Sequence, residues 1–315
     1  MTATTITRPR SATSTGNRRS VRAIAGVEGR RLVRHPAFLL GLAASVLQVM
    51  VRPGTESWAG QTHYVSSIAW TFVWVGTLVA AAAVAGRQRF HADPDLFPAT
   101  PSTPADRVLG TALALAGPVL VTALFIAFVA VMNARAGGFT LGEEPYSVAI
   151  RPSPFEWAQP VLLVALAGVV GILLSQLPRA RLAALIGGVV AGFIGGTFIW
   201  AFQRHPFRVL HPFMYPSYED RLPGTFSPDD WAPGDRPLLP PDDFSVHWRA
   251  VRFDDAALGW HLAYVAGLVL VGVWMAARLA DRGERTASVS RLLLAAAPLL
   301  LIGGVAQVVT AGMNS

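Results

Sequence analysis

Seven long apolar runs, none with an acidic or basic residue in its interior, constrain the fold of this sequence most. They cover residues 36–51, 65–86, 108–132, 157–177, 182–203, 257–277 and 292–311. A helix of roughly 20 apolar residues crosses a hydrocarbon layer about 30 Å thick. Only 14% of the residues are charged, against roughly 25% in a typical soluble domain. The sequence therefore predicts an all-α polytopic membrane protein with six to seven transmembrane helices.

The basic residues indicate how these helices are oriented. All 26 basic residues are arginines. Short loops rich in Arg lie preferentially on the cytoplasmic side of a membrane. Arginines are concentrated before the first run and in every second connection, namely Arg8, Arg10, Arg18, Arg19, Arg22, Arg30, Arg31, Arg34, Arg87, Arg89, Arg107, Arg179, Arg181, Arg278, Arg282, Arg285 and Arg291. We therefore expect a cytoplasmic N-terminus and an external C-terminus in a bacterial plasma membrane.

The runs divide the chain into five parts. We expect a disordered cytoplasmic tail at 1–19, an interfacial helix at 20–35, five transmembrane helices within 36–203, an external segment at 204–256, and two further transmembrane helices within 257–315. The external segment is rich in proline, which breaks regular structure, and we expect it to contain short helical pieces. The last run contains Pro298 and the pair Gly303-Gly304, which are expected to interrupt its helix.

Residues 20–35 have the pattern of a basic amphipathic helix lying at the membrane surface. One helical face carries the apolar residues Val21, Ile24, Ala25 and Leu32, and the arginines Arg22, Arg30 and Arg34 lie largely off it. Glu28 interrupts the apolar face and is placed to pair with Arg31 or Arg30 one turn later. Two interpretations stay open: a functional helix, or charges that only set the topology.

Small residues recur in the fifth run. Gly188, Gly192 and Gly196 are spaced by four, a spacing that lets two membrane helices approach closely. The row is expected to mediate packing, either within a single bundle or across a subunit interface. His261 in the sixth run is expected to be a hydrogen-bonded packing residue.

Several kinds of chemistry are excluded by the composition. The chain has no cysteine, so disulfides and thiolate metal sites are impossible. Without lysine there is no Walker A phosphate loop. His91, Asp93 and Asp95 alternate but lack supporting ligands, and we expect no metal site. The basic residues lie beside apolar runs and are not interleaved with aromatics, so we expect no nucleic-acid partner. No acid lies inside an apolar run, which disfavours an ion-coupled carrier.

Two motifs resemble type-2 ATP-binding-cassette permeases. The first is E-x-R-R-L-x-R-x-P-x-F-L-L-G, present here as Glu28, Arg30, Arg31, Leu32, Arg34, Pro36, Phe38, Leu39, Leu40 and Gly41. The second is a polar connection with a T-P turn and a basic residue before the third span, present as Asp93, Asp95, Leu96, Phe97, Ala99, Thr100, Pro101, Arg107 and Gly110. Two departures from the family pattern stand out: seven predicted spans instead of six, and HADPDLF in the connection.

The resemblance implies a permease subunit of an exporter. Its partners would be a cytoplasmic ATPase subunit, which binds ATP and Mg²⁺, a second permease half in a homo- or heterodimer, and membrane lipid. This chain itself would bind no cofactor and catalyse no reaction. The connection at 87–107 would contact the ATPase through Arg87, Arg89, Phe90, Asp93, Asp95, Leu96 and Phe97, together with the N-terminal helix residues Glu28, Arg30, Arg31 and Arg34. An amphipathic or lipid-like substrate would move by alternating access.

Two other functions are considered beside the permease. Asp229, Asp230, Asp242 and Asp243 of the external segment could supply a general acid and base to an outer-face membrane enzyme. Alternatively, the chain could be a non-catalytic accessory or sensor membrane protein, in which case no ATPase would accompany it.

Overall fold

The structure is a computed structural model of the whole chain. It describes residues 14–51, 72–87, 102–135, 139–141, 148–150, 152–176, 255–281 and 287–313, together with residues 182, 186–188, 190, 212, 218–219 and 252–253. Helices account for most of these residues. They are α1 (Ser14–Val33), α2 (Pro36–Val51), the helix Phe72–Arg87, α4 (Pro104–Ala114), α5 (Ala116–Arg135), α6 (Pro154–Leu174), α9 (Asp255–Ala280) and α10 (Ala287–Met313).

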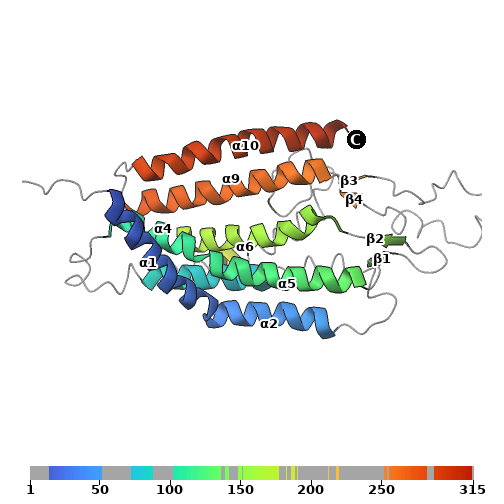
Figure 1. Cartoon of the computed structure of the whole chain (residues 1–315), viewed down its shortest axis with the longest axis horizontal. Helices are drawn as coiled ribbons and strands as arrows, with labels where there is room; N and C mark the ends of the chain where they lie inside the picture. The colour runs from blue at the N-terminus through green and yellow to red at the C-terminus, as the bar shows by residue number, and fades with distance from the viewer. Residues whose placement is uncertain are drawn as a thin grey trace, which may run out of the picture.

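The long helices lie side by side and share one long axis, so the bundle has two ends (Figure 1). At the first, here called the basal end, α1, α4 and α10 begin and α9 finishes. At the second, the distal end, α2, α5 and α10 finish and α6 and α9 begin. α1 therefore begins at the end opposite to the one where α10 terminates.

Several helices have the length and composition of membrane spans. Within the part of the chain that the structure describes, four apolar stretches are long enough, at Pro104–Arg135, Pro154–Leu174, Asp255–Ala280 and Ser290–Thr310. A fifth is the pair Arg19–Val33 and Pro36–Met50, if these two helices, bent by 51°, form one span. The helix Phe72–Arg87 is shorter. Four to five candidate spans thus support an integral membrane protein, whereas the predicted run 182–203 falls mostly outside the described residues.

The faces that these helices turn outward are apolar. Exposed large hydrophobic side chains include Leu40, Leu47 and Met50 on α2, Leu120, Leu124 and Phe128 on α5, and Leu294, Leu301 and Val305 on α10. Exposed apolar patches on this scale are rare on soluble monomers. Lipid tails are the solvent that such faces require.

Two neighbouring pairs of helices run parallel. Val21 and Ile24 of α1 lie against Gly110, and Val33 lies against Gly117, so α1 and α4 advance in the same direction. Likewise, α6 and α9 are parallel, with Phe155 beside Gly259 and Val169 beside Gly272. Between two parallel helices the chain must run back from the end of the first to the start of the second. After α6 it is back at the distal end by Pro212, whose carbonyl lies near Gln159.

Glycines allow α2 and the helix Phe72–Arg87 to touch backbone to backbone. A Cβ added to Gly41 would lie 2.4 Å from the Phe72 carbonyl oxygen, and one added to Gly76 would lie 2.5 Å from that of Ala37. Any larger residue would force these helices apart, as in other small-residue crossings in membranes. The core is built on this contact, with Phe38, Val73 and Ala80 fully buried.

α10 corrects one expectation from the sequence. The helix is continuous from Ala287 to Met313, with Pro298 inside it, so the interruption expected at Pro298 and Gly303-Gly304 is wrong. Neighbouring helices can satisfy the carbonyl that a membrane proline frees. A Cβ on Gly303 would lie 2.8 Å from the backbone nitrogen of Tyr264. This glycine therefore serves close packing on α9 rather than a break.

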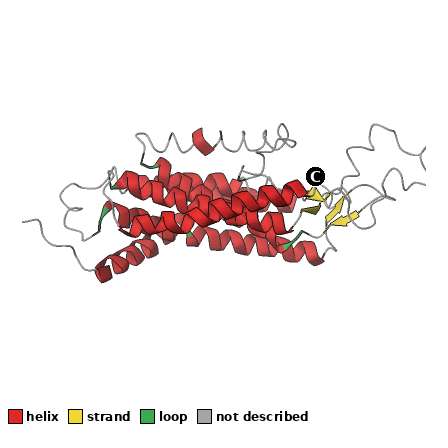
Figure 2. Ribbon diagram, turned by 90° about the horizontal axis from the view of Figure 1, so that it is seen from above, coloured by secondary structure: helices red, strands yellow, loops and turns green. Residues whose placement is uncertain are grey.

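Four short strands form two antiparallel pairs, gathered at one end of the bundle (Figure 2). β1 (Phe139–Leu141) pairs with β2 (Val148–Ile150). Tyr218–Glu219 (β3) pairs with Arg252–Phe253 (β4), just before α9. Both strands of the second pair belong to the predicted external segment 204–256, where short helical pieces were expected.

Candidate functional site

The residues predicted to contact a partner divide into two groups. Arg87 is the exposed last residue of the helix Phe72–Arg87. Arg89, Phe90, Asp93, Asp95, Leu96 and Phe97 lie outside the described residues, as do Gly192 and Gly196. A Cβ on Gly188 would meet Leu78 and Val75 at ordinary contact distances, so this glycine faces a helix of the same chain. The described part of the candidate site is therefore α1 with the start of α4.

The helix predicted at 20–35 is present as α1, which runs from Ser14 to Val33. Residues 14–19 are therefore helical, and the disordered tail expected at 1–19 is wrong for them. The apolar face of α1 covers α4. Leu32 is fully buried, and Arg22, Arg30 and Arg34 are exposed. The contact is close, because a Cβ on Gly110 would lie 2.6 Å from Cγ2 of Ile24. α1 is thus held rigidly against α4 with its basic side chains outward.

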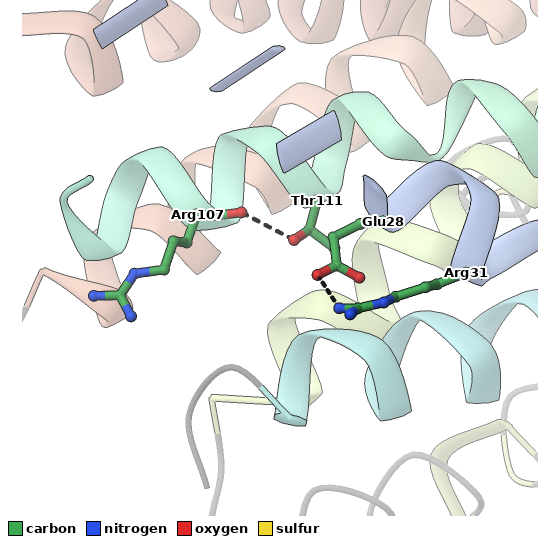
Figure 3. Close-up of polar contacts among 4 residues, drawn as sticks. All are labelled: Glu28, Arg31, Arg107 and Thr111. Atoms are coloured by element: carbon green, nitrogen blue, oxygen red, sulfur yellow. Dashed lines mark hydrogen bonds and ion pairs between the residues drawn. The ribbon is translucent and has the colours of Figure 1, made fainter. Parts of the chain in front are cut away.

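Two polar interactions flank the α1–α4 contact (Figure 3). Arg31 donates from Nη1 to Oε1 of Glu28 at 2.9 Å, which is one of the two pairings expected for that carboxylate. Glu28 is only 6% exposed, whereas the Arg31 side chain is 55% exposed. On α4, Thr111 donates its hydroxyl proton to the Arg107 carbonyl at 2.9 Å. The acid is therefore enclosed by protein while its basic partner reaches solvent or lipid headgroups.

Carboxylates cap the first turn of α4 from two directions. Thr103 and Asp106 form a capping box, in which the Thr103 hydroxyl accepts from the Asp106 amide and the Asp106 carboxylate accepts from the Thr103 amide. Oδ1 of Asp281 accepts from the Ala105 amide at 2.9 Å, across 176 residues of sequence. These bonds satisfy amides that a helix start leaves without partners and place negative charge at the positive end of the helix dipole. They join the last residues of the 87–107 connection to the end of α9.

The length of the α4–α5 stretch indicates how deep this site lies. At 1.5 Å per residue, the 32 residues from Pro104 to Arg135 extend about 48 Å. The hydrocarbon layer is about 30 Å thick, so about 12 residues project beyond it. α4 has 11 residues, carries Asp106 and Arg107, and is separated from α5 at Leu115. Pro118 removes the hydrogen bond that would join the two helices there.

Described basic residues are unequally distributed between the ends of the bundle. At the basal end, or on and directly after α1, are Arg19, Arg22, Arg30, Arg31, Arg34, Arg87, Arg107, Arg278 and Arg291. At the distal end are Arg135, the last residue of α5, and Arg252, which precedes α9. The site is therefore an electropositive platform, formed by α1 and α4, with buried carboxylates beneath it. Such a platform can position an acidic or amphipathic protein surface.

Sequence reasoning missed four residues of this platform. Thr103, Pro104 and Asp106 have the S/T-x-x-E/D pattern with proline at the first helical position, a readable signal for a helix start. Asp281 gave no such signal, because its partner lies 176 residues away. Searches of family models, of curated proteins and of solved structures found no match for this chain.

Proposed function

We propose that the chain is the permease subunit of an ATP-binding-cassette exporter, and that the basal platform receives force from a partner ATPase in the cytoplasm. The observation that supports this most is that the described end of the 87–107 connection continues directly into α4 and α5. Ser102 and Thr103 precede a 32-residue helical stretch. A displacement of the connection would therefore move a helix that crosses the whole bundle.

The platform would distribute this displacement. The tight α1–α4 contact at Gly110 carries it to α1 and α2, and the Asp281–Ala105 hydrogen bond carries it to α9. Packed interfaces shift as rigid units rather than deforming continuously. ATP and Mg²⁺ would bind on the partner, and movement of the helices would open a pathway for an amphipathic or lipid-like substrate. A second permease half would complete that pathway.

The orientation follows from the same platform. Arginine-rich ends of membrane helices face the cytoplasm, so the basal end would be cytoplasmic and the distal end external. This places the platform, with its exposed Arg22, Arg30 and Arg34, where a cytoplasmic ATPase can reach it.

Co-purification with an ATPase encoded beside this chain tests the proposal. We expect the wild-type complex to hydrolyse ATP in a manner that depends on the permease. In the double variant Leu96→Ala and Phe97→Ala, we expect that coupled activity to fall about tenfold or more, because truncating the central apolar side chains of an interface costs on the order of 2 kcal/mol or more. Membrane insertion should persist.

The matched control truncates two apolar side chains far from the platform. Leu301 and Ile302 on α10 are 69% and 56% exposed, so Leu301→Ala with Ile302→Ala should leave coupled ATP hydrolysis unchanged. Wild-type activity in the Leu96/Phe97 variant would refute the proposed contact. The absence of any co-purifying ATPase would favour an accessory or sensor protein instead.

A further inference from the structure

Three uncharged polar side chains converge inside the distal part of the bundle. Gln159 of α6, His261 of α9 and Gln307 of α10 are 2%, 0% and 0% exposed. Each lies five or six residues from the distal end of its helix, which corresponds to a depth of about 8–9 Å. They form one layer, although they come from three helices.

Two of these side chains, His261 and Gln159, meet at one main-chain carbonyl, that of Pro212, and Gln307 contacts the other ring nitrogen of His261. His261 lies with Nε2 3.2 Å from the Pro212 oxygen and with Nδ1 2.8 Å from Oε1 of Gln307. Nε2 of Gln159 lies 3.5 Å from the same Pro212 oxygen. Pro212 belongs to the connection between α6 and α9, more than 45 residues away from either partner. The Pro212 carbonyl oxygen is therefore held by side chains from two helices, α6 and α9, that are distant from it in the sequence.

The donors and acceptors of this layer determine its hydrogen-bond pattern. The Pro212 oxygen can only accept, so Nε2 of the imidazole must donate, and in the neutral ring Nδ1 accepts. An acceptor such as Nδ1 is satisfied when a glutamine amide presents its NH₂ group to it, and a half turn of the amide exchanges its NH₂ group and its oxygen. This half turn at Gln307 brings the buried Nε2, which otherwise has no hydrogen-bond partner, to the Nδ1 acceptor. The chain Gln307–His261–Pro212–Gln159 is then continuous.

We infer that Gln159, His261 and Gln307 form an internal binding site for a carbonyl oxygen, which seats the α6–α9 connection on the distal end of the bundle through Pro212. One further observation agrees with this. The β3–β4 pairing ties Tyr218–Glu219 of the same connection to Arg252–Phe253, immediately before α9. The hydrogen bonds also have a physical reason, because burying three polar side chains among apolar helices is costly unless each is hydrogen-bonded. The inference does not depend on the proposed function.

The absence of cysteine from the sequence makes a direct accessibility test possible. A single reporter cysteine is introduced beside Pro212 as Phe213→Cys, and its rate of reaction with a membrane-impermeant maleimide is measured in vesicles with the distal end outward. We expect the labelling rate to rise about fivefold or more in Gln159→Met and in His261→Leu, because each loses a hydrogen bond to the Pro212 carbonyl. Gln176→Met, at the other end of α6, is the matched control and should leave the rate unchanged.

A second reporter separates release of the connection from unfolding. Ala167 of α6 is fully buried, so Ala167→Cys should stay unlabelled in every variant whose bundle is intact. His261→Gln, which keeps an amide donor, should label more slowly than His261→Leu. Faster labelling at residue 213 with continued protection at residue 167 supports the site. Unchanged labelling at residue 213 in both Gln159→Met and His261→Leu, or equal exposure of both reporters, would overturn it.

Discussion

α4 and α6 begin with the same local motif at opposite ends of the bundle, and their surroundings differ. Thr103-Pro104-Ala105-Asp106 starts α4, and Ser153-Pro154-Phe155-Glu156 starts α6, each with both capping hydrogen bonds formed. At the basal end a carboxylate from α9 adds a third bond. Near the distal start of α6, the neighbouring buried groups are the uncharged Gln159, His261 and Gln307.

The difference shows that the same helix start can serve two purposes. At the basal end, the carboxylates of Asp106 and Asp281 accept from backbone amides, and Glu28 pairs with the exposed Arg31. At the distal end, uncharged side chains hold a main-chain carbonyl inside the bundle. Moving a charged group into apolar surroundings costs far more free energy than moving an uncharged, hydrogen-bonded group. This explains why the layer formed by Gln159, His261 and Gln307 is uncharged.

Changing Gly110 should have the largest effect on the basal end. In Gly110→Ala, the new methyl group would meet Ile24 at 2.6 Å, so α1 must move away from α4, and we expect a loss of about 1–3 kcal/mol in the free energy of unfolding. Unfolding in mixed micelles measures it. Gly26→Ala is the matched control, because nothing lies within 4 Å of its added Cβ; it should be neutral or stabilising by up to about 1 kcal/mol. Equal effects of the two changes would show that α1 is not packed on α4.

Removing the link between α9 and α4 should have the next largest effect. Asp281→Ala loses the acceptor for the Ala105 amide, and we expect a loss of about 1–2 kcal/mol in the free energy of unfolding. Asp281→Asn keeps an oxygen acceptor and should recover much of this loss. If the alanine and wild-type proteins unfold alike, the link contributes nothing to the basal end.

The two capping boxes offer a direct comparison between the ends. Thr103→Ala and Ser153→Ala each remove one capping acceptor, and each should cost about 1 kcal/mol in the free energy of unfolding. The Asp281 bond remains in the first variant, so combining Thr103→Ala with Asp281→Ala should cost more than the sum of the two single changes. Simple additivity would show that the two caps act independently.

Breaking the Glu28–Arg31 pair from its exposed side should have the smallest effect. The Arg31 side chain is 55% exposed, and exposed ion pairs stabilise proteins by at most about 1 kcal/mol. Arg31→Gln should therefore lower the free energy of unfolding by less than about 1 kcal/mol, and less still at high salt. A loss of several kcal/mol that persists in 1 M salt would mean that Arg31 satisfies a buried charge.

Features that depend on local sequence were largely predictable, and contacts between distant residues were not. Charge-free runs located the helices that became α5, α6, α9 and α10, and the alternation of apolar and basic residues gave the buried face of α1. The contact of Gly41 with Gly76, the Asp281–Ala105 bond and the layer around Pro212 join residues at least 35 positions apart. Nothing in a local pattern specifies which distant partner a glycine or a glutamine will meet.

The error at α10 has the same origin. Pro298 and Gly303-Gly304 are unfavourable inside an isolated helix. Packing against α9 overrides that preference, since Gly303 lies where the backbone of Tyr264 approaches most closely. The low helix propensity of proline and glycine in water predicted a break in α10. The helix has no such break when it is packed on α9.

The sidedness of the two ends tests the central claim most directly. Single cysteines replace exposed arginines in this cysteine-free chain, as Arg87→Cys and Arg291→Cys at the basal end and Arg135→Cys at the distal end. A membrane-impermeant maleimide applied to intact cells should label residue 135 and leave residues 87 and 291 unlabelled until the cells are permeabilised. Labelling of residues 87 and 291 in intact cells, with residue 135 protected, would place the platform outside and contradict the proposed contact with a cytoplasmic ATPase.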